Sequence, residues 1–213
     1  MKILLLVNKK KKFSNQIINI TKKKFKNSKI LDHNEPLDES KKYDYVLSYL
    51  SKKILKKKFL KSTKQYNINF HPGSSKYPGI GCFNFALYNN EKSYGVTAHI
   101  MSEKVDTGKI IVERKFKIKK NLNVKMISEK SYVEMFKLYK EILHIIKRNE
   151  VRFSSVKWKR RPYQRSDLNN LSKINFNDTK STILKKIRCT YFEGKPKPYI
   201  LIKGIKFSFE KII

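Results

Sequence analysis

Short apolar runs separated by lysine-rich segments mark the first part of the chain. Their length and the polar residues around them are typical of buried strands. The runs lie at residues 1–8, 29–31, 44–50 and 66–70. Apolar residues at helical spacing predict two helices between them, over 13–25 and 51–60. This order predicts an α/β domain with a mostly parallel central sheet flanked by helices.

Two more strands and a long helix are expected before residue 150. Alternating apolar and polar residues predict strands over 94–101 and 109–118. Ser131 and Glu134 form a capping box, which predicts a helix start. The apolar residues that then recur at helical spacing are Tyr132, Met135, Phe136, Tyr139, Leu143 and Ile146. They predict an amphipathic helix packed on the sheet.

The pattern weakens after residue 150. A helix over 180–188 and two strands over 199–202 and 206–210 are expected there. The length of 213 residues suffices for one sizeable domain with a small appendage. We therefore predict a main domain over 1–150 and a small C-terminal α+β extension over 151–213 that makes substrate or dimer contacts.

The composition indicates a folded and strongly basic protein. Fifty Lys+Arg residues against 17 Asp+Glu give a formal net charge of +33, and 39% of the residues are hydrophobic. This hydrophobic fraction predicts a packed core, while the charge suggests nucleic acid or an anionic membrane as a partner. Only seven of the basic residues are Arg, whereas specific nucleic-acid readout favours Arg. We favour a lysine-rich solvated surface, with nucleic acid as the alternative partner.

The remaining composition limits the chemistry and predicts a cytoplasmic protein. Two cysteines, Cys82 and Cys189, cannot make a disulfide scaffold or a four-cysteine zinc site, and no other metal-ligand spacing occurs. We expect Cys82 to be a packing residue. No apolar run reaches the length of a membrane helix, and residues 3–7 are too short for a signal peptide.

Candidate chemistry gathers around one loop. Residues 71–81 (HPGSSKYPGIG) follow a predicted strand, where α/β sheets place ligands. Asn69 and His71 stand two apart at the end of that strand, so both side chains leave one face. Asp106 lies between two later strands. The three side chains form one site if these strand ends are neighbours. Taken singly, such a His is more often structural and such an Asp more often a turn residue.

Taken together, these motifs are specific. Asn-Phe-His-Pro-Gly, Tyr-Pro-Gly, Gly-Val-Thr-x-His and Val-Asp-Thr-Gly-x-Ile-Ile occur in this order over residues 44–118. The segment resembles the 10-formyltetrahydrofolate-dependent formyltransferases. The resemblance implies a Rossmann-like formyltransferase domain and an enzyme that transfers a formyl group to an amine without a metal. It assigns Asn69, His71 and Asp106 as the catalytic residues. Asn69 and protonated His71 would stabilise an oxyanion, and Asp106 would raise the pKa of His71 and help take the amine proton.

The same resemblance implies contacts to the co-substrate 10-formyltetrahydrofolate. The matching positions are Ser48, Tyr49, Lys53, Ile54, Leu55, Met101 and Val105. Ile54 and Leu55 are equally well interpreted as core residues. The candidates for substrate binding are Tyr77, Pro78 and Gly79, with Trp158, Arg188 and Tyr191 as candidates for a nucleotide. His99 lies inside a predicted strand and is interpreted as structural.

Departures from the family pattern narrow the choice of acceptor substrate. No glycine-rich loop follows the first strand, which disfavours a glycinamide ribonucleotide substrate. The residues after 150 are too few for the C-terminal barrel of the methionyl-tRNA enzymes. The pattern is closest to the amino-sugar N-formyltransferases of surface polysaccharide and lipopolysaccharide biosynthesis, which act on nucleotide-linked amino sugars. A methionyl-tRNA formyltransferase-like enzyme and a nucleic-acid-binding protein on a degenerate enzyme fold remain alternatives. A homodimer through the last 60 residues is also left open.

Overall fold

The computed structural model describes residues 1–119 and 122–209. Its main feature is a six-stranded sheet in the order β2-β1-β3-β4-β5-β6. The strands are β1 (Ile3–Val7), β2 (Ser28–Asp32), β3 (Tyr45–Tyr49), β4 (Tyr66–His71), β5 (Ser93–Ile100) and β6 (Ile110–Lys117). The first four run parallel, whereas β5 and β6 are antiparallel to their neighbours. The prediction of an α/β domain with a mostly parallel sheet is confirmed.

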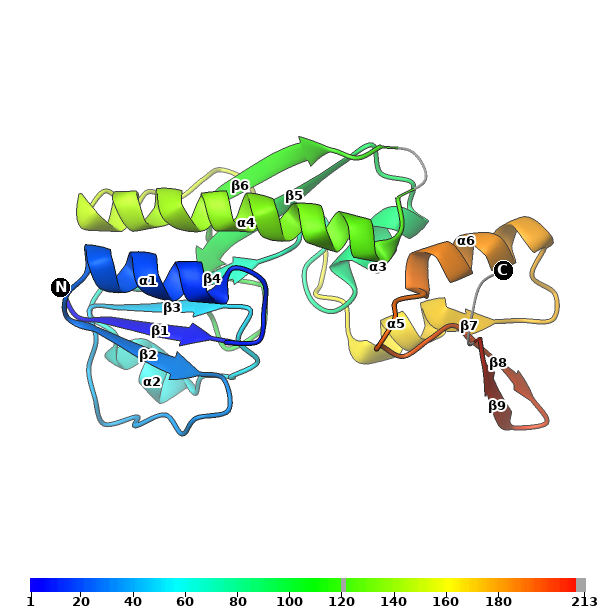
Figure 1. The fold of residues 1–213 in the computed structure, drawn as a ribbon, viewed down its shortest axis with the longest axis horizontal. Helices are drawn as coiled ribbons and strands as arrows, with labels where there is room; N and C mark the ends of the chain where they lie inside the picture. The colour runs from blue at the N-terminus through cyan, green and yellow to red at the C-terminus, as the bar shows by residue number, and fades with distance from the viewer. Residues whose placement is uncertain (120–121, 210–213) are drawn as a thin grey trace.

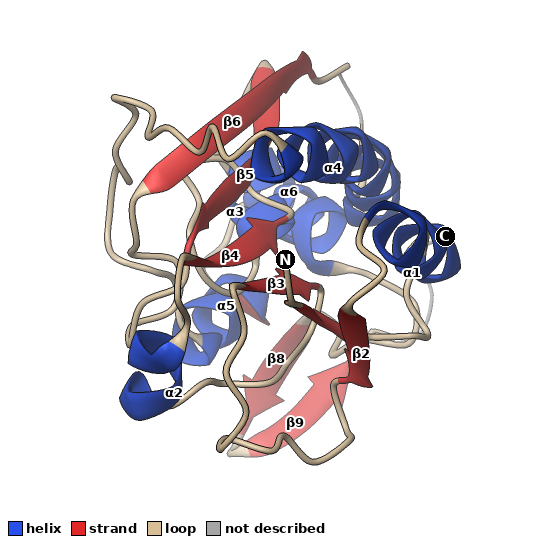
Figure 2. Ribbon diagram, turned by 90° about the vertical axis from the view of Figure 1, so that its left-hand side faces the viewer, coloured by secondary structure: helices blue, strands red, loops and turns tan. Residues whose placement is uncertain are grey.

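Helices cover both faces of this sheet. Figures 1 and 2 show α1 (Ser14–Lys24) and α4 (Val124–Lys147) on one face and the short α2 (Lys57–Ser62) on the other. A buried hydrogen bond of 2.6 Å between the hydroxyls of Thr21 and Tyr139 joins α1 to α4. Strand β1 is completely buried, because it is apolar on both faces and lies between the two layers.

Two predicted helix starts are wrong. Helix α4 begins at Val124, where the Asn123 side chain accepts from the N–H of Met126. Ser131 lies inside the helix, and its hydroxyl donates to the Ile127 carbonyl. The buried stripe of the first two turns mixes Val124 and Ile127 with Ser128 and Ser131, so its apolar pattern is weaker than in the rest of the helix. Helix α2 begins at Lys57, so residues 51–56 have no helical structure.

The C-terminal residues build a smaller unit beside α3 (Cys82–Tyr88), as Figure 1 shows. It contains α5 (Arg165–Ser172), β7 (Lys173–Ile174), α6 (Lys180–Thr190), β8 (Tyr199–Ile202) and β9 (Ile205–Ser208). The last three strands form a separate sheet in the order β7-β8-β9. The expected helix and hairpin are confirmed, although Glu210 lies outside the described residues. The pattern did not predict α3, α5 or β7, because α3 is apolar all round and α5 is mostly polar.

An irregular segment over residues 151–164 joins the two parts and runs along the main sheet. The Ser154 N–H donates to the Ile110 carbonyl, and the Lys159 N–H donates to the Ser75 carbonyl. Tyr163 then forms a β-bridge with Gly79 in the loop after β4. The C-terminal extension is thereby tied to the loop that carries the candidate chemistry.

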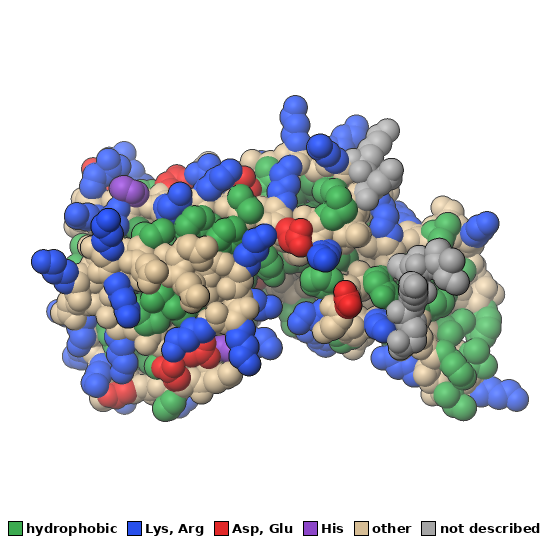
Figure 3. All heavy atoms as spheres, in the orientation of Figure 1, with side chains coloured by type: hydrophobic (Ala, Val, Ile, Leu, Met, Phe, Trp, Pro, Cys, Tyr) green, Lys and Arg blue, Asp and Glu red, His purple; other side chains and the backbone are tan. Residues whose placement is uncertain are grey.

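The basic residues are spread over the surface rather than gathered in a band. Figure 3 shows Lys and Arg side chains scattered across both parts on the face in view. A single continuous basic stripe, which a dedicated nucleic-acid surface would need, does not occur on that face. Among the described residues, no helix has the length and apolarity that a membrane crossing requires.

Candidate active site

Three side chains meet at the end of β4. Asn69 and His71 leave one face of the strand, and Asp106 approaches them from the connection between β5 and β6. The Asp106 carboxylate lies 3.1 Å from Nδ1 of His71 and 3.5 Å from Nδ2 of Asn69. Strands β4 and β5 are neighbours in the sheet, which is why residues 35 positions apart converge. The sequence predicted the three residues but could not show that the strand ends are adjacent.

His99 is a fourth member of this group. It stands opposite Asn69 in the β4–β5 pairing, and its Nε2 lies 3.1 Å from both the Asn69 amide nitrogen and Asp106 Oδ1. Its Nδ1–H donates to the Ile100 carbonyl over 2.9 Å. A neutral His99 therefore accepts from Asn69 at Nε2, whereas a protonated His99 donates to Asp106. The interpretation of His99 as a purely structural residue missed this position; the signal was its place next to Asn69 across the strand pair.

The carboxylate of Asp106 is buried yet held ionised. Burial by itself raises the pKa of this carboxyl, but the charge of His71, the hydrogen bond from His99 and the N–H of Gly79 outweigh it. The net result is a pKa below the ordinary range. The Gly79 N–H donates to Asp106 Oδ2 over 2.8 Å. Asp106 also adopts a left-handed backbone with φ of 50°, a conformation in which non-glycine residues are uncommon.

His71 is fixed on both sides of its ring. Nε2 donates to the Tyr77 carbonyl over 3.0 Å, since a carbonyl oxygen can only accept. Nδ1 faces Asp106 Oδ2 at 3.1 Å. The Gly73 backbone passes so close that a Cβ there would collide with Nε2 of His71. A glycine is required at this point of the loop for steric reasons.

Trp158 covers the two histidines from the C-terminal segment. Its indole N–H donates to the Gly108 carbonyl over 2.8 Å. The ring lies edge-on to His71 and His99, with centroids 5.9 and 5.0 Å away. The structure thus places Trp158 against the histidine pair. The prediction that it contacts a nucleotide stays a prediction.

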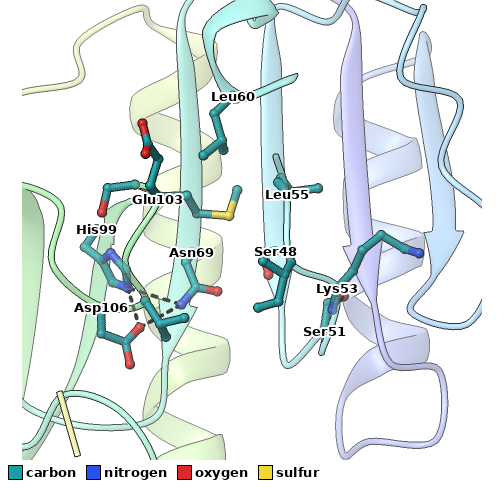
Figure 4. Close-up of a pocket in the computed structure, with 13 residues that line it drawn as sticks. Ser48, Ser51, Lys53, Leu55, Leu60, Asn69, His99, Glu103 and Asp106 are labelled. Atoms are coloured by element: carbon teal, nitrogen blue, oxygen red, sulfur yellow. Dashed lines mark hydrogen bonds and ion pairs between the residues drawn. The ribbon is translucent and has the colours of Figure 1, made fainter. Parts of the chain in front are cut away.

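A pocket opens in front of Asn69, His99 and Asp106, as Figure 4 shows. Its walls are apolar side chains from the segment after β3, from α2 and from the loop after β5; they are Ile54, Leu55, Leu60, Met101 and Val105. Polar side chains also line it, namely Ser48, Ser51, Lys53, Ser102 and Glu103. His71 does not line the pocket, because it lies behind Asp106. The pocket has the composition that a flat heteroaromatic ligand with a polar reacting end requires.

Most of the residues predicted to bind the co-substrate line this pocket, and one does not. Ser48, Lys53, Leu55, Met101 and Val105 are all in its wall. In Figure 4, the Lys53 side chain extends away from Asn69.

Ile54 and Tyr49 differ from the expectations. Ile54 is 73% exposed and lines the pocket, so its interpretation as a core residue is wrong. Tyr49 is fully buried on the other face of the sheet, where its ring packs against Phe70 and Tyr139. Neighbouring residues on a strand point to opposite faces, so Ser48 and Tyr49 cannot both face the pocket.

The residues predicted to bind the acceptor, Tyr77, Pro78 and Gly79, make contacts inside the protein. Tyr77 is buried, and its hydroxyl donates to Glu91 over 2.8 Å. The Pro78 carbonyl accepts from the Tyr163 N–H, and the Gly79 N–H is used by Asp106. These three residues do not line the pocket in front of Asn69.

The other predicted residues lie elsewhere. Arg188 reaches Asn90 on a separate surface, and Tyr191 lies directly after α6. Cys82 is buried, which raises the pKa of its thiol to about 12 and agrees with a packing role.

The arrangement suits acyl-type transfer rather than metal chemistry. The Asn69 amide, the ionised Asp106 carboxylate and the His99 imidazole line an apolar pocket, and His71 contacts Asp106 from outside it. Such groups can donate to a developing oxyanion and accept a proton. Within residues 1–119 and 122–209, no group of three His, Cys, Asp or Glu side chains could hold a metal ion.

Fold and site together define a class of protein. The model of the formyl transferase family matches residues 2–143, which include every residue of the site except Trp158. The chain therefore belongs to the formyl transferase family, and the identification made from the motifs is confirmed.

Particular relatives refine this placement. The chain is 33% identical over 95% of its length to the bifunctional polymyxin resistance protein ArnA of Wigglesworthia glossinidia brevipalpis, and it spans 31% of that protein. A sugar N-formyltransferase from a Shewanella species shares the fold with TM-score 0.77 and 20% identity, covering 98% of this chain and 96% of that one. An N-formyltransferase from Helicobacter canadensis, in complex with folinic acid and dTDP-3-aminofucose, has TM-score 0.73 and 19% identity over 89% of this chain and 80% of that one.

Proposed function

We propose that this protein transfers the formyl group of 10-formyltetrahydrofolate to the amine of a nucleotide-linked amino sugar. The observation that carries the proposal is the cluster of Asn69, His71 and Asp106 at the end of β4, in which Asn69 and Asp106 line the pocket and His71 contacts Asp106. Each residue type has a task in amine formylation, and the three come from segments that only this sheet brings together. Membership of the formyl transferase family supports the reaction class.

The chemistry can be assigned to individual atoms. The acceptor nitrogen attacks the formyl carbon, and the carbonyl electron pair moves to oxygen. The Asn69 amide nitrogen contacts His99 at 3.1 Å and Asp106 at a longer 3.5 Å, and during the reaction it donates to the oxyanion in place of the longer contact. Asp106 takes the proton that the attacking nitrogen loses. When the bond from the formyl carbon to N10 of the folate breaks, this proton ends on N10.

His71 acts on Asp106 in this scheme. Its ring nitrogens face Tyr77 and Asp106, and it lies behind the carboxylate rather than in the pocket. The neighbouring His71 lowers the pKa of Asp106 and so helps to keep the carboxylate ionised before the reaction. This role differs from the direct oxyanion contact that the resemblance implied for His71.

The pocket fits the folate co-substrate. Ile54 and Val105 are exposed apolar side chains in its walls, and a flat pterin or aminobenzoyl ring would cover them. Aliphatic walls that lead to a polar end orient such a ligand with its reacting group toward Asn69.

A basic cavity supports a phosphate-bearing acceptor. This cavity of about 440 Å³ lies between the start of α3 and the C-terminal extension. Its cationic residues are Arg165, Lys195, Lys197 and Lys206, and none of its described lining residues is acidic. The loop that places Gly79 on Asp106 continues into this cavity with Ile80 and Gly81. Diphosphate oxygens are strong acceptors for Arg and Lys side chains.

Lys11, in the loop between β1 and α1, adds to this positive region. Burial lowers the pKa of Lys11, and the nearby charges of Lys195 and Lys52 lower it further. An anion bound between these lysines would relieve their repulsion. The Helicobacter canadensis neighbour was solved with a dTDP-linked amino sugar, which agrees with an acceptor of this type.

The decisive test is an assay with 10-formyltetrahydrofolate and a panel of nucleotide-linked amino sugars, following tetrahydrofolate release and product mass. We expect one member of the panel to gain one formyl group. Lys195→Ala should raise KM for that acceptor with little change in KM for the folate. Lys22→Ala, at an exposed position of α1, should change neither KM value. Formylation of methionyl-tRNA instead would overturn the sugar assignment. RNA binding without any transfer would overturn the enzyme assignment.

A further inference from the structure

The loop over residues 72–81 holds the atoms that orient the acid–base pair. The Tyr77 carbonyl accepts from Nε2 of His71, and the Gly79 N–H donates to Oδ2 of Asp106. Apart from the single bridge at Gly79, the loop has no strand or helix of its own. Its position must therefore be set by contacts to its surroundings, and those contacts decide how His71 and Asp106 face each other.

Glu113 on β6 provides one buried side-chain anchor, and Glu91 provides a second anchor further along the loop, where it accepts from the Tyr77 hydroxyl. Oε1 of Glu113 accepts from the Ser75 N–H over 2.8 Å and from the Ser75 hydroxyl over 3.0 Å. The Glu113 side chain is only 3% exposed, so these bonds are made in a medium where losing them is costly. The Tyr77 N–H donates to the Ser74 carbonyl, which links Tyr77 to the anchored part of the loop.

Glu113 is in register with His71 across three neighbouring strands. His71 pairs with Thr97 across β4 and β5, and Thr97 pairs with Glu113 across β5 and β6. The Thr97 hydroxyl also binds the loop, since it donates to the Gly73 carbonyl over 2.7 Å. Gly95 lets the loop lie on the sheet here, because a Cβ at that position would press on Ser74. Residues 73–75 thus pack directly on strands β5 and β6.

The second oxygen of Glu113 shows that the anchor is not an ordinary ion pair. Among the residues that the structure describes, Oε2 is buried without a hydrogen-bond partner, and Lys115 Nζ lies 3.9 Å away. A hydrogen-bond acceptor at Oε1 suffices for both bonds to Ser75, so a glutamine could make them equally well.

We propose that Glu113 is a positioning residue for formyl transfer. It holds residues 74–75 so that Tyr77 and Gly79 keep His71 and Asp106 in their reacting orientation. Glu113 itself lies outside the pocket and touches no reacting atom. The inference rests on the proposed function for its kinetic consequence, whereas its structural consequence can be measured without any acceptor.

The kinetic arm compares Glu113→Ala, Glu113→Gln and Glu141→Gln. Glu141 is a matched control, because it pairs with the next residue of β6, Arg114, and does not contact the loop. We expect Glu113→Ala to lower kcat by about 10- to 100-fold, since small misplacements of reacting groups have effects of this size. KM for the folate should stay within about twofold, because no residue of the loop lines its pocket. Glu113→Gln should recover most of kcat.

A pH profile separates positioning from a purely structural role. In Glu113→Ala the Gly79 N–H moves away from Asp106, and a carboxylate that loses a donor is protonated at higher pH. The acid limb of kcat/KM should therefore move to higher pH in Glu113→Ala but not in Glu141→Gln. A loss of kcat that matches the unfolded fraction, with an unmoved acid limb, would overturn the proposal. Equal losses in Glu113→Ala and Glu113→Gln would overturn it as well.

The acceptor-independent arm is amide hydrogen exchange of the peptide that contains residues 72–81. Exchange at Ser75, Tyr77 and Gly79 should be faster in Glu113→Ala than in the wild type, with Glu113→Gln close to the wild type. Unchanged exchange would overturn the anchoring role even if no acceptor had been found. Faster exchange in a protein that formylates nothing would instead refute the proposed function and leave the anchor standing.

Discussion

The indole of Trp158 stands edge-on to the imidazole of His99, with ring centroids 5.0 Å apart and an interplanar angle of 85°. Trp158 belongs to the irregular segment after α4, and His99 belongs to β5. The C-terminal extension thus closes the side of the site that the main sheet leaves open. Water behind the histidines would weaken their interaction with Asp106, because a polar medium screens charges.

Removal of this cover should impair transfer more than folding. We expect Trp158→Ala to lower kcat by about tenfold or more through a misplaced and hydrated histidine pair. Trp158→Phe keeps an aromatic edge against His99 but loses the bond to Gly108, and should have a smaller effect. Steady-state kinetics of both variants, with thermal unfolding as a control for folding, measure this. Full activity in Trp158→Ala would show that the ring only fills space.

The charge of Asp106 should be essential for catalysis. Asp106→Asn keeps the shape of the side chain but cannot take the amine proton, so kcat should fall by about 100-fold or more. Folate binding should persist, because the apolar walls of the pocket are unchanged. Single-turnover rates and fluorescence titration with the folate separate the two effects. Near-normal turnover would refute the role of Asp106 as the proton acceptor.

The same variant should change the acid stability in a defined direction. The pKa of Asp106 is lowered in the folded state, so its ionised form contributes stability above the unfolded carboxyl pKa of about 3.9. That contribution is lost as the pH falls below this value toward the folded pKa. The wild type should therefore exceed Asp106→Asn in free energy of unfolding at pH 5 to 7, and the difference should shrink below about pH 4. Urea unfolding at several pH values measures it; a constant difference would contradict the assignment.

Gly73 should be intolerant of any side chain. A Cβ there would collide with Nε2 of His71 and press on the Tyr77 carbonyl, so Gly73→Ala must break the bond between them. We expect a stability loss of about 1–3 kcal/mol and a strongly reduced kcat. Lys22→Ala is the control, because it removes an exposed side chain of α1. Kinetics and thermal unfolding of the pair would reveal the difference; an active Gly73→Ala would show that His71 can move.

Ile54 should contribute to folate affinity without contributing to stability. Its side chain is 73% exposed in the free protein, and a ligand in the pocket would cover it. Ile54→Ala should raise KM for the folate about three- to tenfold, which corresponds to part of its apolar area. Phe176→Ala removes a side chain that is 72% exposed away from the pocket, and should leave KM unchanged. Equal KM values for the two variants would place the folate elsewhere.

Much of the fold follows from local pattern. Strand β1 is apolar on both faces and could only be a buried strand, and the stripe of α4 from Tyr132 to Ile146 could only face the sheet. The elements that local pattern did not reveal have weak signals of their own. Helix α3 is apolar all round, and the first turns of α4 carry serines in the buried stripe, so their place depends on neighbours rather than on periodicity.

The site divides in the same way. In the sequence, spacing alone places Asn69 and His71 on one face, because a strand has a period of two, and a Gly- and Pro-rich loop follows them. Its motifs also pointed to Asp106. Only the tertiary structure decided that His99, Glu113 and Trp158 belong to the same arrangement. Their contacts cross β5, β6 and the C-terminal segment, and the relative placement of separate segments is set by packing over the whole chain, which no local spacing records.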